Sequence, residues 1–277
     1  QDTSGTQSQN NSSIVQGGVG DSWEVMATLE GNPGPITALA SIGNILYSAS
    51  NRSFKVWNVD TMQSISDVAV NNSNMGSIKS LTIWPEKNII VTACDKLINL
   101  WDLVSLQSIG VLRAHKDEVR CLYVADDLLI SAGKGTPNSG SILFWDLRST
   151  SPLEEREKNQ DIFTLQTHDN MLYYGGRNRY IKRLRLSNME VFPQFEPPHL
   201  DAVSSLAIIE NSLVSGSWDK NLRRWSLGQE VLDNAVQYNA HQTAVNCLSS
   251  DINQKYLYSG GKEGAVKVWR LHPDTRR

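Results

Sequence analysis

The sequence predicts an all-β fold, a β-propeller of six blades, and two repeated features of the chain support this prediction. The first is an anchor residue, usually tryptophan, that recurs every 39–44 residues; its copies are Trp57, Trp101, Trp145, Leu184, Trp225 and Trp269. The second is a four-residue element ahead of each anchor, composed of a β-branched residue, a variable residue, a small residue and leucine; the elements begin at residues 36, 78, 119, 162, 203 and 245. Repeats of about 40–45 residues that contain four short strands form propeller blades.

The strands of each blade follow from this frame. Between element and anchor lie short runs such as "ILYSAS", "LLISAG" and "SLVSGS", which are rich in β-branched and aromatic residues and are bounded by turn residues. The innermost strand of a blade crowds the axis of the ring, so we expect only small side chains at the third position of the element. The residues there are Ala38, Ser80, Cys121, Thr164, Ser205 and Cys247.

Two of the three cysteines, Cys121 and Cys247, are therefore expected to be packing residues. The third, Cys94, is far from both in the sequence, and an odd number of distant cysteines does not indicate a disulfide framework. A reducing compartment fits this pattern.

The two ends of the chain suggest how the ring closes. An outer strand follows each anchor, as "TMQSISDV" follows Trp57, but only "RLHPDTRR" with its Pro273 follows Trp269. At the other end, "WEVMATLE" (residues 23–30) resembles an outer strand with no blade in front of it. We therefore expect residues 23–30 to pair beside the strand that ends at Trp269 and to close a six-bladed ring. The alternative is a seven-bladed parent from which one blade is missing.

These features divide the chain into a flexible leader (1–22), a propeller (23–271) and a C-terminal tail (272–277). The leader is rich in Ser, Gln, Asn and Gly and cannot bury enough apolar surface to order itself. No signal peptide and no long apolar run is present, so we expect a cytoplasmic protein that does not bind membranes. The net charge of −3 and the pI near 6.0 provide no basic field for nucleic acid.

From residue 24 to residue 271 the chain resembles the WD40-repeat propellers. The "WD" dipeptide is literal at Trp101-Asp102 and at Trp145-Asp146, and a histidine precedes the inner strand in three repeats, at His115, His199 and His241. The resemblance implies a scaffold that binds other proteins.

The stretch "SGSWDKNLRRW" (215–225) raises the question of catalysis, because a serine, a histidine upstream and an aspartate could form a triad. No nucleophile-elbow pattern surrounds Ser215. In WD40 blades, these residue types instead form a buried hydrogen-bonded set, which in this chain is complete only in the fifth repeat: His199, Ser215, Asp219 and Trp225. We therefore expect a structural tetrad and no enzyme.

Cofactor and metal sites are not indicated either. "GKGTPNSGS" (133–141) lacks the spacing of a Walker A loop and is better interpreted as a lengthened turn. The five histidines lack metal-ligand spacing. We expect no cofactor and no metal.

A partner would bind on one rim of the central channel. In such propellers the loops before the inner strand and after the second strand open on the same face, and the latter loop carries a cation in almost every repeat, with an exposed tryptophan in the fifth. The predicted partner-binding rim is Arg52, Lys96, Lys134, Arg177, Arg179, Trp218, Lys220 and Lys262. Acidic residues in the former loops make this face mixed in charge, and a rim of solvated turn cations without a ligand is the alternative.

A narrower resemblance is carried by residues 192–225, "FPQFEPPHLDAVSSLAIIENSLVSGSWDKNLRRW", with "AHQTAVNCL" and "GGKEGAVKVW" after it. These segments are similar to the WD40 tail of kinesin-4-type motors. The similarity implies a tail domain concerned with microtubules and motor regulation. The cationic rim would then suit an acidic peptide from tubulin or from a motor regulator. The alternatives are an adaptor of another complex, such as a ubiquitin-ligase substrate receptor or a trafficking scaffold, and an RNA-binding propeller.

Overall fold

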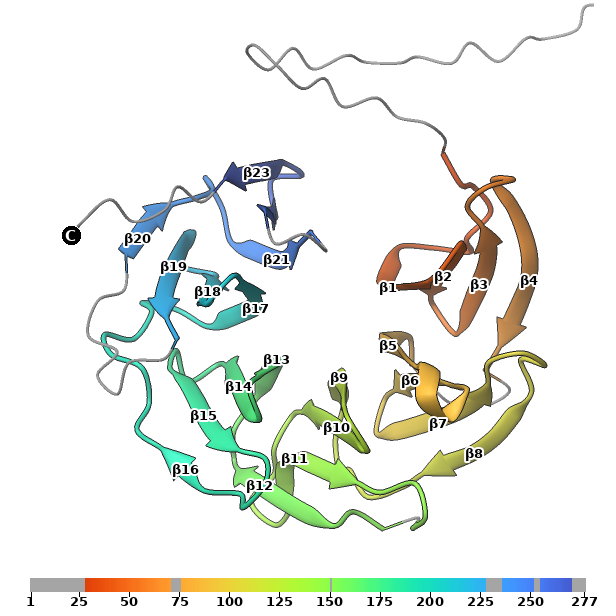
Figure 1. Ribbon diagram of the computed structural model, residues 1–277, viewed down its shortest axis with the longest axis horizontal. Coiled ribbons are helices and arrows are strands. Elements are labelled where there is room, and N and C mark those ends of the chain that lie inside the picture. The colour runs from red at the N-terminus through yellow and green to blue at the C-terminus, as the bar shows by residue number, and fades with distance from the viewer. Residues whose placement is uncertain (1–27, 71–75, 150, 228–235, 252–254, 271–277) are drawn as a thin grey trace, which may run out of the picture.

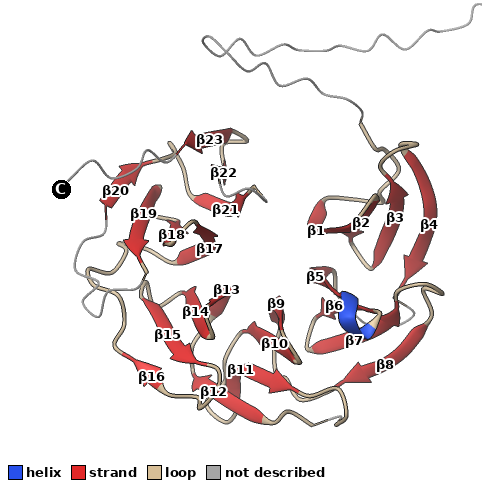
Figure 2. Cartoon of the chain, in the orientation of Figure 1, coloured by secondary structure: helices blue, strands red, loops and turns tan. Residues whose placement is uncertain are grey.

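A computed structural model describes residues 28–70, 76–149, 151–227, 236–251 and 255–270. Six antiparallel sheets stand around a common axis, and Figure 1 shows them following one another in chain order around a ring. The helical content of the described residues is confined to the short 3₁₀ turn η1 (Pro85–Lys87), and strands dominate the view in Figure 2. The prediction of an all-β propeller with six blades is confirmed.

Each blade is one sheet whose strands run outward from the axis in chain order. The first three blades are β1 (Ile36–Ile42), β2 (Ile45–Ser50), β3 (Ser53–Asn58) and β4 (Gln63–Ala69); β5 (Ile78–Trp84), β6 (Ile89–Cys94), β7 (Leu97–Asp102) and β8 (Ser108–Leu112); and β9 (Val119–Ala125), β10 (Leu128–Gly133), β11 (Gly140–Trp145) and β12 (Glu154–Lys158). The last three are β13 (Ile162–His168), β14 (Met171–Gly176), β15 (Ile181–Arg185) and β16 (Val191–Phe192); β17 (Val203–Ile209), β18 (Ser212–Ser217), β19 (Asn221–Ser226) and β20 (Val236–Asn239); and β21 (Val245–Ser250), β22 (Tyr256–Gly261) and β23 (Val266–Arg270).

The hydrophobic core lies between the blades. Each apolar cluster joins the facing sides of two successive blades; one, for example, brings Trp84 and Ile98 of blade 2 against Leu122 and Trp145 of blade 3. A single blade could not cover either of its own faces, so the burial of these side chains depends on the ring arrangement.

The small residue at the third position of the inner strand joins neighbouring blades where it carries a hydroxyl; Cys247, which was expected to be a packing residue, is exposed. The hydroxyl of the third residue accepts a hydrogen bond from the backbone N–H of the leucine in the next blade. This bond joins Ser80 to Leu122 at 3.1 Å, Thr164 to Leu206 at 3.0 Å, and Ser205 to Leu248 at 3.0 Å. At these three junctions the residue is therefore both a spacer and a polar link between neighbouring blades.

Two blade faces are not covered by any described residue. The first residue of the inner-strand element is buried in blades 2 to 6, whereas Ile36 of blade 1 is 44% exposed; on the same face, Leu39 is 60% exposed. The residue three positions before the anchor is buried in blades 1 to 5, whereas Val266 of blade 6 is 72% exposed. Figure 1 shows that these faces lie on the two sides of the opening between β21 and β1.

The predicted ring closure remains a prediction. Residues 23–27 of the proposed closing strand lie outside the described residues, as do the leader (1–22) and the tail (272–277), while residues 28–30 belong to no strand. Blade 6 has three strands among the described residues, so the edge of β23 is the place where a closing strand would pair.

Candidate functional site

Every inner strand contains a β-bulge at the same place. The register of each inner strand with the second strand of its blade skips the residue after the β-branched one, which is the variable position of the sequence element. A bulged residue is unpaired, and its side chain is re-aimed relative to the rest of the strand. The six bulge residues are Thr37, Lys79, Arg120, Phe163, Ser204 and Asn246.

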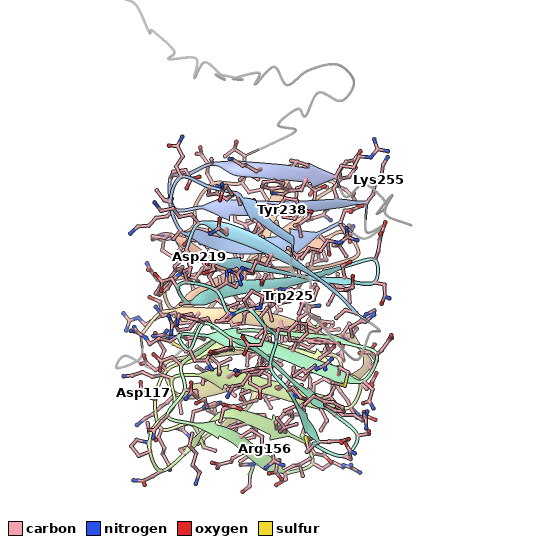
Figure 3. All side chains as sticks on the ribbon, turned by 90° about the vertical axis from the view of Figure 1, so that its left-hand side faces the viewer. Asp117, Arg156, Asp219, Trp225, Tyr238 and Lys255 are labelled. Carbon is pink, nitrogen blue, oxygen red and sulfur yellow. The ribbon has the colours of Figure 1, made fainter. Side chains whose placement is uncertain are left out.

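The eight residues of the predicted rim lie in or directly beside the turns between the second and third strands of the blades, and all eight are exposed. Figure 3 shows Asp219, which belongs to one of these turns, and Asp117, which precedes an inner strand, on the same face of the disc; Lys255 lies at the opposite face. We call the bulge residues together with these turn residues the axial rim.

Acidic residues neutralise part of the axial rim. Lys134 pairs with Asp117 at 3.0 Å, and Arg177 lies 3.3 Å from Asp161. The carboxylate of Glu118 serves two cations, Arg120 at 2.9 Å and Lys79 at 3.5 Å. Four predicted rim cations have no carboxylate partner in the part of the chain that the structure describes: Lys96, Arg179, Lys220 and Lys262. The axial rim therefore keeps a positive excess, carried by fewer residues than the turn pattern suggests.

A pocket of about 280 Å³ opens on the axial rim. It is lined by four bulge residues from four successive blades and by one predicted rim residue: Arg120, Phe163, Ser204, Asn246 and Trp218. The sequence analysis missed the four bulge residues as site residues. The signal that could have identified them is the residue type at this position, which varies from repeat to repeat, whereas the positions on either side always carry a β-branched or a small residue.

The fifth blade contains a continuous chain of buried hydrogen bonds. The indole N–H of Trp225 donates to Ser215 Oγ at 3.1 Å, Ser215 Oγ lies 2.7 Å from His199 Nε2, and His199 Nδ1 lies 2.9 Å from Asp219 Oδ2. Because a carboxylate only accepts, Nδ1 of His199 donates to Asp219, and because an indole only donates, Ser215 accepts from Trp225. Ser215 is 0% exposed, so no substrate reaches its hydroxyl.

The carboxylate of Asp219 is held in its charged form. Burial would raise the pKa of Asp219, but hydrogen bonds from His199 and from the backbone N–H groups of Leu200 and Asn221 lower this pKa well below its usual range. These bonds also fix the turn that carries Trp218.

The sixth blade contains a second complete chain, which the sequence analysis did not anticipate. Trp269 donates to Ser259 at 2.8 Å, Ser259 lies 2.7 Å from His241 Nε2, and His241 Nδ1 lies 2.5 Å from Glu263. Glu263 follows Ser259 by four residues, as Asp219 follows Ser215, so this spacing could have predicted the second chain of hydrogen bonds. A hydrogen bond from the hydroxyl of Thr243 is the main reason why the pKa of Glu263 falls to about 2.

The other blades keep parts of this arrangement. In blade 3, Trp145 and His115 both bond to Ser131, at 2.8 and 2.7 Å. Burial lowers the pKa of His115 to about 4. The "GKGTPNSGS" segment spans the connection between β10 and β11, as expected for a lengthened turn. Within the described residues, no group of three or more His, Cys, Asp and Glu side chains could hold a metal ion.

Comparison with known proteins agrees with this architecture. Residues 23–58, 66–102 and 234–270 match the family model of the WD domain, G-beta repeat. The chain carries WD40 repeats. Propellers of this kind generally serve as non-catalytic scaffolds for protein interactions, and the buried state of Ser215 agrees with that role.

The proteins to which the chain is similar include a kinesin-like protein. The chain is 27% identical to Kinesin-like protein KIF21B of Mus musculus over 90% of its own length and 16% of the length of that protein. It is 27% identical to the CCR4-associated factor 4 homolog of Candida glabrata, over 70% of this chain and 31% of that protein. It is also 27% identical to Mitochondrial division protein 1 of Mycosarcoma maydis, over 53% of this chain and 20% of that protein. The chain thus spans only a fraction of the length of each relative.

No helix among the described residues is long and apolar enough to cross a membrane.

Proposed function

We propose that this WD40 propeller is the protein-binding tail domain of a cytoskeletal, kinesin-like protein and that its axial rim binds an acidic peptide segment. The observation that carries the proposal is the similarity to a kinesin-like protein over 90% of the chain. The segment with the "FEPPH" sequence, on which the narrower resemblance rests, is built into the fifth blade. Phe195 is buried against Trp225, with ring centroids 5.1 Å apart, and Arg223 donates to the carbonyls of Pro197 and Pro198 at 2.6 and 2.7 Å.

The charge of the axial rim supports an acidic partner. The chain carries a net charge of −3, yet four rim cations have no carboxylate partner among the described residues, and Glu118 is shared by two more. An acidic segment is attracted to such a surface and gives its cations the partners that they lack. Tubulin or a motor regulator is the partner we propose, in the cytoplasm.

An adaptor role in another complex is the second candidate. It is supported by the similarity to the CCR4-associated factor 4 homolog and to Mitochondrial division protein 1, which are WD40-containing proteins outside the kinesins. RNA binding is a third outcome, because a basic surface with an exposed aromatic residue can also bind single strands.

Sedimentation of the chain with microtubules tests the proposal. We expect Lys96→Glu combined with Lys262→Glu to weaken binding by about tenfold, because each reversal replaces an unpaired cation by a repelling carboxylate. Lys255→Glu, on the opposite face (Figure 3), is the matched control and should bind as the wild type does. Equal binding by the double variant would refute the axial rim as the binding surface.

A salt titration separates RNA binding from binding of a peptide. Affinity for an RNA oligonucleotide falls steeply with salt, because counterions are released from each neutralised phosphate. If the chain binds oligouridine and does not bind microtubules, the cytoskeletal proposal is wrong.

A further inference from the structure

Two aromatic residues stand at positions where the other blades place polar ones. Among the bulge residues, Phe163 is the aromatic exception to Thr37, Lys79, Arg120, Ser204 and Asn246. At the third position after the second-strand serine or its equivalent, Trp218 is the exception to Asn51, Asp95, Lys134, Arg177 and Lys262.

These two exceptions belong to adjacent blades and contact each other. The ring centroids of Phe163 and Trp218 are 5.3 Å apart with an interplanar angle of 31°. The guanidinium of Arg120 lies over the ring of Phe163, 4.9 Å from its centroid. The three side chains, from blades 3, 4 and 5, therefore form one cluster in the wall of the 280 Å³ pocket.

Trp218 gives this cluster an exposed aromatic surface. Trp218 is 40% exposed, whereas Trp57, Trp84, Trp101, Trp145 and Trp225 are all buried. Trp218 lies in a tight turn between β18 and β19, and its backbone N–H is fixed by a 3.0 Å hydrogen bond to Ala202. A large, rigid aromatic side chain that borders a pocket and is partly open to solvent is typical of an interaction hot spot.

The polar part of the pocket lies beside this surface. The side chain of Asn246 makes no hydrogen bond to any described residue, and Ser204 directs its hydroxyl to backbone carbonyls of Gly216 and Val245, at 3.0 and 2.5 Å. Arg120 shares the carboxylate of Glu118 with Lys79, so the pair of cations retains a positive excess.

We infer that the pocket lined by Arg120, Phe163, Ser204, Trp218 and Asn246 anchors one aromatic side chain of the acidic segment. The incoming ring packs against Phe163 and Trp218, the amide of Asn246 bonds to the peptide backbone beside it, and the flanking carboxylates of the segment meet Arg120 and Lys262. This inference rests on the proposed function, since it specifies the residue by which an acidic partner is recognised.

Fluorescence anisotropy with two labelled peptides tests the anchor. One peptide is Glu-Glu-Gly-Tyr-Glu-Glu, and its counterpart has alanine in place of tyrosine. We expect the tyrosine peptide to bind the wild-type chain about tenfold more tightly than the alanine peptide, as an aromatic hot-spot residue does. Trp218→Ala and Phe163→Leu should remove this difference, so that each variant binds the tyrosine peptide no more tightly than the alanine peptide. Phe163→Leu keeps an apolar side chain at the bulge and removes only the aromatic ring. Val104→Ala, at another exposed apolar position, is the control and should keep the difference between the two peptides.

The outcomes separate the anchor from the function on which it rests. If both peptides bind the wild type equally and both are weakened by Lys96→Glu with Lys262→Glu, the anchor is wrong and the acidic partner stands. If neither acidic peptide binds while a peptide with lysine in place of glutamate does, both proposals are wrong. If the tyrosine peptide keeps its advantage on folded Trp218→Ala protein, the tyrosine is bound elsewhere and the inference fails.

Discussion

Ser215 illustrates how the same three residue types serve structure in one protein and catalysis in another. A catalytic serine needs an exposed hydroxyl and a nearby oxyanion hole. Here, the hydroxyl is fully buried and lies between an indole that donates to it and an imidazole that is oriented by Asp219. The hydrogen bonds continue to the backbone N–H groups of Leu200 and Asn221, so the chain links the loop before β17 to the turn before β19.

Loss of one member of this chain should destabilise the fold. We expect His199→Ala or Asp219→Ala to lower the free energy of unfolding by about 1–3 kcal/mol, because each leaves buried polar groups unpaired. Urea denaturation measures the change. A wild-type denaturation midpoint for both variants would contradict the tetrad as a stabilising element.

His115 should make stability depend on pH. The pKa of His115 is about 4 in the native state, whereas the pKa of an unfolded histidine is about 6.5. Between these values the unfolded state binds more protons, so the free energy of unfolding should fall as the pH is lowered from 6.5 to 4, by at most about 3 kcal/mol. His115→Asn should flatten this part of the profile, whereas His168→Asn, near exposed Asp169, is the control. An unchanged slope in the His115 variant would exclude the buried imidazole as its source.

At the scale of the element, the inner strand performs three tasks with four residues. The β-branched residue and the leucine fill the interface between blades, the small residue accepts the N–H of the next blade where it is a serine or threonine, and the bulge frees the remaining residue from pairing. Pairing and packing fix three of the positions. The bulge residue is released from both, which explains why it varies and why it can carry specificity.

The hydroxyl at the third position can be tested without changing the shape of the side chain. Thr164→Val should lower the free energy of unfolding by about 1–3 kcal/mol, because the N–H of Leu206 loses its acceptor in a buried place. Thr82→Val on β5 is the matched control, since its hydroxyl makes no hydrogen bond to a described residue. Equal effects of the two substitutions on the denaturation midpoint would show that the interblade bond contributes nothing.

At the scale of the whole molecule, the ring has an opening between β21 and β1. Exposed Ile36, Leu39 and Val266 occupy positions that are buried at the other junctions, and an uncovered apolar sheet face is an aggregation hazard. The matches at 66–102 and 234–270 each include the outer strand of the preceding blade, β4 or β20, ahead of an inner strand. By the same alignment, residues 23–30 correspond to an outer strand, which supports the proposal that they pair with β23.

Truncation tests this closure. Removal of residues 1–30 should unfold or aggregate the protein, because blade 6 would lose its outer strand and the ring its link to blade 1, whereas removal of 1–20 should change nothing. Thermal melting and light scattering provide the measurements. A stable, monomeric 31–277 fragment would refute the closing role of this segment, and a wild-type chain that aggregates through the open faces would favour the seven-bladed alternative.

The sequence by itself predicted the six blades of this chain, the place of each inner strand and the turns with their cations. It could do so because every blade meets the same packing requirements, so the anchor, the leucine and the small residue recur in the chain. The exposed state of the eight predicted rim residues follows from the same repeat.

Only the tertiary structure decided which side chains from different blades meet. Arg120, Phe163 and Trp218 belong to three different repeats, and nothing within one repeat shows that the arrangement of the blades around the axis brings them into contact. The ion pairs that neutralise Lys134 and Arg177 are likewise set by the distances between side chains of neighbouring segments, not by residue type. A repeat specifies its own strands, whereas a site built across blades depends on the orientation of one blade relative to the next, which is decided by packing.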